Sequence, residues 1–110
     1  MYEMGNVDWK NTPMDEKTRK ELLELDSVLG DVLGLEIVVQ SYKVEIAAAD
    51  EYLVGIVKRN MGGCHWWGGI CLEDCFENMM KDLKRGVMVG LPRFESASEL
   101  RMKLELGWML

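Results

Sequence analysis

The sequence is poor in several residues and patterns on which protein function often depends. It has one histidine and two prolines, and no run approaches the ~18 consecutive apolar residues that a membrane-spanning helix needs. Its first five residues offer neither a basic start nor an apolar core, so we expect no signal peptide and no membrane association. An odd number of cysteines, three, without an export signal favours free thiols in a cytoplasmic protein.

Catalytic and cofactor motifs are missing as well. The chain has no GxGxxG or GxxxxGK[ST] loop to hold phosphate groups, and no GxSxG turn to present a nucleophilic serine. His65 is the only imidazole, so a catalytic triad would lack partners. Acid pairs such as Asp50-Glu51 have no obvious second acid across a predictable cleft. We therefore expect neither an enzyme nor a bound cofactor.

The chain is long enough for one folded domain, and its charge is unevenly distributed. Its 110 residues are 48% hydrophobic and 29% charged, which is ordinary for a globular protein. The net charge is −6: residues 1–51 carry 12 acids and 5 bases, whereas residues 52–110 carry 7 acids and 8 bases. This balance argues against direct nucleic-acid binding, which needs a basic surface, and is compatible with a basic protein partner. We expect a single α+β domain spanning residues 1–110.

The first third of the chain predicts a helix after an irregular start. Residues 1–11 are polar with scattered aromatics, and we expect an irregular lead-in. Thr12 can cap a helix through its hydroxyl, and Pro13 suits the first helical position. Apolar residues then recur along one face until Gly30 or Gly34 ends the helix. These apolar residues are Leu22, Leu25, Val28, Leu29 and Val32.

The middle and last parts of the chain predict strands and two more helices. We expect one long or two short strands over residues 35–48, a turn at 49–51, and strands over 52–58 and 64–70. Apolar spacing predicts a helix over 72–85 that Gly86 ends, then a short strand over 87–91. Ser96 begins a capping pattern for a third helix that extends towards Trp108. The predicted order is α-β-β-β-α-β-α, an antiparallel sheet of three to four strands covered by two or three helices.

The segment 62–75 gathers all three cysteines, the histidine and two tryptophans, and it has three competing interpretations. Cys71 and Cys75 lie one helical turn apart, and Cys64 or His65 could join them in a zinc site, although the spacing is unusual for one. Cys64 could be a thiol nucleophile, but His65 next to it on a strand would point to the opposite face.

The third interpretation concerns Trp66 and Trp67, which are flanked by a glycine pair on each side. They could form a docking feature, because tryptophan is enriched in binding hot spots. Alternatively, one tryptophan packs in the core and the other covers the sheet.

These observations favour a protein-binding module. Small acidic domains can act as inhibitors by occluding a basic cleft on a nucleic-acid-handling enzyme, as immunity proteins and phage anti-defence proteins do, an analogy of size and charge only. The candidate partner contacts are Asp15, Glu16, Glu21, Glu24, Asp26, Asp31, Asp50, Glu51, Trp66 and Trp67. One alternative is a homo-oligomeric accessory or structural protein that associates through the apolar segment Leu104–Leu110. A further alternative is a zinc protein or small thiol enzyme that uses Cys64, His65, Cys71 and Cys75.

Overall fold

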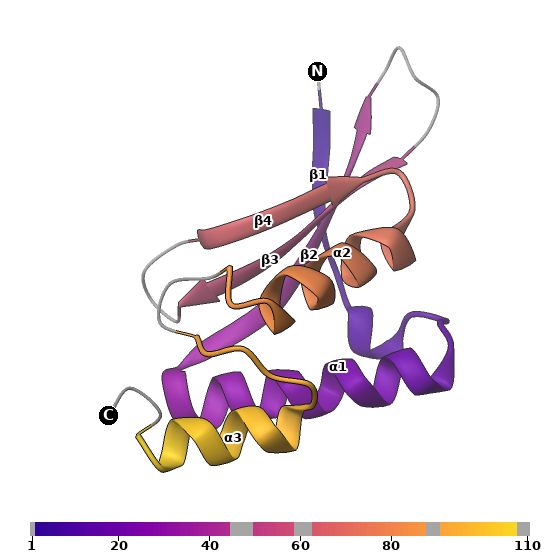
Figure 1. Ribbon diagram of the computed structural model, residues 1–110. Helices are drawn as coiled ribbons and strands as arrows, with labels where there is room; N and C mark the ends of the chain where they lie inside the picture. Colours follow the sequence, from indigo (N-terminus) through magenta and orange to yellow (C-terminus); the bar gives the residue numbers. More distant parts are fainter. Residues whose placement is uncertain (1, 45–49, 59–62, 88–90, 108–110) are drawn as a thin grey trace.

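The computed structural model describes residues 2–44, 50–58, 63–87 and 91–107, and it confirms the predicted α+β class (Figure 1). In the described residues, a four-stranded antiparallel sheet has the order β1-β2-β3-β4. The strands are β1 (Tyr2–Val7), β2 (Leu35–Val44), β3 (Asp50–Lys58) and β4 (Gly63–Gly69). The helices are α1 (Glu16–Val28), α2 (Leu72–Lys84) and α3 (Ala97–Glu105), and the short helical segments are η1 (Trp9–Asn11) and η2 (Leu29–Leu33).

One face of the sheet supplies part of the hydrophobic core. Side chains alternate between the two faces of a strand, so the row formed by Val39, Val54 and Trp67 on three neighbouring strands shares a face. All three are buried, as are Ile37 and Ile56 on the same face. This face can be buried only if other elements cover it.

The helices cover that face and complete the core. In Figure 1, α2 lies across β3 and β4, while α1 lies below the sheet beside β2. Phe76 and Met79 of α2 are buried together with Leu22 and Leu25 of α1 in one cluster that also contains the sheet residues. The third helix packs on α1 and adds Leu100, which is fully buried, to the same cluster.

The start of the chain differs from the expectation. The irregular lead-in predicted for residues 1–11 is wrong over Tyr2–Val7, which form β1 and pair with β2 from Val39 to Val44. Local sequence gives little sign of this strand, because its stability comes from pairing with a segment far along the chain. Trp9 then enters the core, and its indole Nε1 donates a hydrogen bond of 3.0 Å to the Ile37 carbonyl.

The first helix begins later than its proline suggested. Its cap is Asp15, which accepts a hydrogen bond from the Thr18 amide, and not Thr12. Thr12 instead follows η1, and its hydroxyl donates to the Asp8 carbonyl. At the other end a wider helical turn, η2, leads into Gly34, whose φ of 67° confirms one of the two predicted stops.

Most of the remaining boundaries agree closely with the sequence patterns, although α3 ends at Glu105, short of the extension predicted towards Trp108. The turn predicted at 49–51 is wrong for residues 50 and 51, which belong to β3, and residue 49 lies outside the described residues. The strand predicted over 87–91 falls mostly on residues 88–90, which also lie outside them. Ser96 caps α3 as predicted, accepting from the Glu99 amide at 3.2 Å. No helix in the described ranges is long and apolar enough to cross a membrane.

Candidate functional site

One candidate contact surface is an apolar groove between α1 and α3. It has a volume of about 690 Å³ and is lined by Leu23, Glu24, Ser27 and Val28 of α1 and by Ala97, Ser98, Arg101, Met102, Glu105 and Leu106 of α3 and its end. Each of the two helices faces the core with a row of buried apolar side chains. The groove lies outside these rows, where the exposed edges of the two helices meet.

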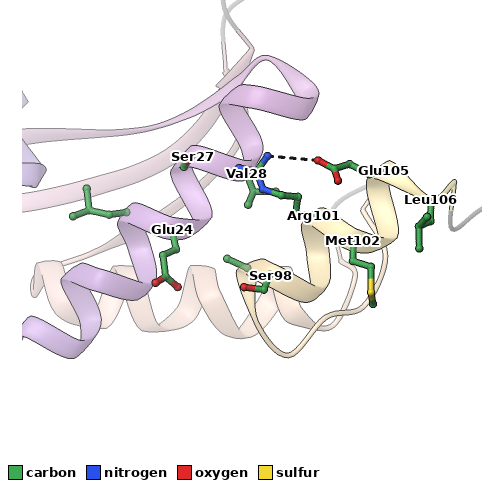
Figure 2. Close-up of a pocket in the computed structure, with 10 residues that line it drawn as sticks. Glu24, Ser27, Val28, Ser98, Arg101, Met102, Glu105 and Leu106 are labelled. Carbon is green, nitrogen blue, oxygen red and sulfur yellow. Dashed lines mark ion pairs between the residues drawn. The ribbon is translucent and has the colours of Figure 1, made fainter.

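Three large apolar side chains are exposed in this groove. Leu23 is 39% exposed, Met102 52% and Leu106 73%, and Met102 and Leu106 lie one turn apart on the same side of α3 (Figure 2). Among the described residues only Trp66, Ile70 and Val87 are other large hydrophobic residues with comparable exposure, and none of them lines this groove. Single exposed apolar residues are normal, whereas several of them along one groove form a candidate contact surface. We name this feature the α1–α3 groove.

Charged side chains frame the groove. Arg101 reaches from α3 to Asp31 at 3.0 Å and to Glu105 at 3.7 Å, the second of which Figure 2 marks with a dashed line. The pair with Asp31 links α3 to η2, which follows α1. Glu24, on the opposite wall, is exposed and has no ion pair within the described part of the chain. The rim is therefore acidic on the α1 side.

Most of the acids that the sequence proposed as partner contacts do not have a free carboxylate in the described part of the chain. Most of those described have partners within the chain: Glu21 pairs with Lys84 at 2.7 Å, and Asp26 pairs with Lys10 at 3.2 Å. Asp31 pairs with Arg101, Glu16 lies 3.8 Å from Arg19, Asp15 caps α1, and Glu51 accepts a hydrogen bond from the Tyr42 hydroxyl. The side chain of Asp50 lies outside the described set. Glu24 alone combines exposure with an unpaired carboxylate at the α1–α3 groove.

The two neighbouring tryptophans lie on opposite faces of the sheet. Trp67 is 8% exposed and belongs to the core, and its Nε1 donates to Asp82 on α2 at 2.8 Å. Trp66 is 38% exposed on the other face, where its ring covers Gly55 of β3 so closely that a Cβ there would lie 2.3 Å from the ring. The two indoles therefore do not form one docking feature. The alternative that we gave, one tryptophan in the core and one over the sheet, describes their placement.

The cysteines and His65 do not assemble into a metal centre in the residues that are described. No group of three or more potential ligands lies together among them, and the side chain of Cys64 is outside the described set. His65 packs against Trp67, with ring centroids 4.4 Å apart. Cys71 is exposed at the start of α2, whereas Cys75 is buried. Burial, and then the neighbouring groups Cys71 and Asp74, raise the pKa of the Cys75 thiol, which disfavours its nucleophilic form.

Sequence reasoning did not identify Leu23, Met102 or Arg101 as parts of a site. Leu23 is the apolar residue of α1 that falls outside the buried stripe, and that mismatch was the one available signal. Leu104 and Leu106 belonged to the predicted oligomerisation segment. Leu104 packs against the core, Leu106 lines the groove, and residues 108–110 lie outside the described part. Comparison of the chain with protein-family models, with curated proteins and with solved structures gives no match.

Proposed function

We propose that this protein is a protein-binding module whose contact surface is the α1–α3 groove. The observation that carries the proposal is the clustering of Leu23, Met102 and Leu106 as exposed side chains along one groove. Burying such side chains against a partner removes apolar surface from water, at roughly 25 cal/mol per Å². A groove between two helices suits the apolar face of an amphipathic helix on the partner protein.

The chain offers well-matched controls for a test. Ile70 is 70% exposed and Val87 52%, which closely matches Leu106 at 73% and Met102 at 52%, but neither lines the groove. We would purify complexes from the native host with the natural sequence, with Met102→Ser/Leu106→Ser, and with Val87→Ser/Ile70→Ser. A partner that binds the α1–α3 groove is retained by the natural sequence and by the Val87/Ile70 variant, and is lost from the groove variant. Equal retention by both variants would refute the assignment of the surface.

The narrower form of the proposal is an inhibitor that occludes a basic cleft on a nucleic-acid-handling enzyme. The net charge of −6 and the free carboxylate of Glu24 at the groove support it. The internal pairing of the other described acids, Asp26 and Asp31 among them, argues for the apolar groove as the main contact. Salt distinguishes the two forms, because exposed charges are screened over about 10 Å at 0.1 M ionic strength, whereas apolar burial is not. Affinity that falls steeply with added NaCl would favour the acidic contact.

A second candidate function is self-association, which Leu106 specifically favours. It is the most exposed large apolar side chain described, and it belongs to the segment Leu104–Leu110 on which the alternative prediction of a homo-oligomer rests. Light scattering on the full chain and on a chain ending at Leu104 tests this. A dimer that becomes a monomer on truncation supports self-association, and a monomer in both cases removes it and leaves a different protein as the partner.

A further inference from the structure

A second groove, unlike the first, is lined mainly by basic side chains. It lies between the end of α2, the segment 91–94 and α3, and has a volume of about 770 Å³. Its lining residues are Lys81, Lys84, Arg85, Arg93, Phe94, Glu95, Glu99 and Lys103. Five of these are basic and two are acidic, a local balance of +3 in a chain whose net charge is −6. We name this feature the basic groove.

The end of α2 is shaped so that these bases converge. Gly86 has a φ of 75°, and its amide donates to the Leu83 carbonyl at 3.0 Å, while the Val87 amide donates to the Asp82 carbonyl at 3.2 Å. This pattern ends the helix and reverses the chain. The Phe94 amide then donates to the Lys84 carbonyl at 3.2 Å, which holds the returning segment against the helix end.

Contacts with α3 fix the position of Arg93. Lys103 donates from Nζ to the Arg93 carbonyl at 2.6 Å and also pairs with Glu99 at 3.0 Å. The stem of Arg93 lies beside Gly86, where an added Cβ would be 3.5 Å from Cγ of the arginine. Arg93 therefore lies beside Gly86 and lines the same groove as Arg85, although the two arginines are separated along the chain.

Three of the five cations are left unpaired. Lys84 pairs with Glu21 and Lys103 with Glu99. Lys81, Arg85 and Arg93 have no ion pair among the residues described, and all three are exposed. Lys81 and Arg85 lie one turn apart, so their side chains leave the end of α2 in the same direction. An anionic ligand in the groove would meet three free positive charges, two of them guanidinium groups that can bind a carboxylate through two parallel hydrogen bonds.

We propose that the basic groove binds a short acidic peptide segment of a partner protein, a site separate from the α1–α3 groove. The net charge of −6 disfavours a long polyanion such as nucleic acid, which would extend beyond the groove onto acidic surface. Stacking on bases is also disfavoured, because the aromatic residue of the lining, Phe94, is only 3% exposed. A short acidic segment contacts the groove alone, since charges further away are largely screened at physiological salt.

The test uses the full-length protein and a fluorescently labelled peptide of alternating glutamate and glycine, with a peptide carrying glutamine at the glutamate positions for comparison. Fluorescence anisotropy measures binding to the natural sequence, to Arg85→Gln/Arg93→Gln and to Lys20→Gln/Lys58→Gln. The second variant removes the same net charge from exposed positions that do not line the basic groove. All four positions are exposed, so we expect all three proteins to unfold at the same temperature.

We expect the glutamate peptide to bind better than the glutamine peptide, and the Arg85/Arg93 variant to bind it at least about threefold more weakly. The Lys20/Lys58 variant should bind like the natural sequence. Equal binding of the two peptides, or equal weakening in the two variants, would overturn the proposal. A single-stranded oligothymidylate serves as the competing ligand, and its tighter binding through Arg85 and Arg93 would overturn the assignment to an acidic peptide.

Discussion

Asp26 offers the sharpest test of how this fold is held together. The first strand stops opposite Val39 at Val7, so Ile37 would face the open edge of β2 with both backbone groups unpaired. Two side chains take the place of the missing strand: Asp26 accepts from the Ile37 amide at 2.9 Å, and Trp9 donates to its carbonyl at 3.0 Å. Asp26 is thus a substitute for sheet pairing as well as a surface acid.

Replacing Asp26 with alanine should destabilise the protein more than any change at an exposed acid. The lost charged hydrogen bond contributes about 1.5–3 kcal/mol, because the Ile37 amide stays partly buried without a partner. The pair with Lys10 adds up to about 1 kcal/mol, since the lysine is 53% exposed and the carboxylate 15%. The free energy of unfolding should therefore fall by roughly 2–4 kcal/mol, which corresponds to a fall in melting temperature on the order of 10 °C for a domain of this size.

Urea unfolding measures this effect and separates its parts. Asp26→Asn keeps an oxygen that can accept from Ile37 and should cost only about 1 kcal/mol, while Lys10→Met should cost less than about 1 kcal/mol. Glu16→Ala is the control, because that carboxylate is 91% exposed. The reasoning is refuted if Asp26→Ala costs no more than Glu16→Ala, or if Asp26→Asn costs as much as Asp26→Ala.

Three further outcomes follow from single positions. Gly55→Ala should force the Trp66 ring off the sheet, lower the free energy of unfolding by about 1–3 kcal/mol and shift the tryptophan fluorescence. The same substitution should have almost no effect on stability when Trp66→Ala is also present, because the ring that it would displace is then absent. Gly86→Ala should cost about 1–2 kcal/mol in thermal unfolding because of its positive φ. Because the pKa of Cys75 is raised in the folded protein, the unfolded chain releases the thiol proton at lower pH than the folded protein does. The natural protein should therefore lose stability relative to Cys75→Ala as the pH rises above 9.0. At neutral pH, a thiol reagent should label the exposed Cys71 before the buried Cys75.

The helices were predictable where local signals agree with each other. In α2, apolar spacing, acids in the first turn, bases in the last turn and Gly86 all specify the same element, and the observed bounds are Leu72–Lys84. The start of α1 was not predictable in the same way, because Thr12 and Asp15 are competing helix caps within four residues. Asp15 caps the helix, since Thr12 is held at the end of η1 by its bond to the Asp8 carbonyl, in the turn that places Trp9 in the core.

The first strand could not be predicted from its own residues. Tyr2–Val7 contain a glycine and an asparagine, which are depleted in strands, and no clear alternation of apolar and polar residues. Its partner β2 begins after α1, so the pairing is a long-range contact that only the assembled fold specifies.

The placement of the two tryptophans, in contrast, could be predicted from the sequence. Two adjacent residues on a strand point to opposite faces, so the predicted strand already implied that Trp66 and Trp67 could not share a surface.

The candidate sites were hidden because charge along a sequence does not reveal charge on a surface. Two acids of the first helical region pair with bases that come much later in the chain: Asp31 pairs with Arg101, 70 residues away, and Glu21 pairs with Lys84. The uneven charge along the chain therefore does not translate directly into an acidic face, because part of it is paired across the fold. The turn at Gly86 also brings Arg85 and Arg93, which are separated along the chain, into the lining of one groove, where neither has an ion pair among the described residues. A partner of this protein would therefore meet the groove charges that have no ion pair among the described residues, such as Glu24 at the α1–α3 groove and Lys81, Arg85 and Arg93 at the basic groove.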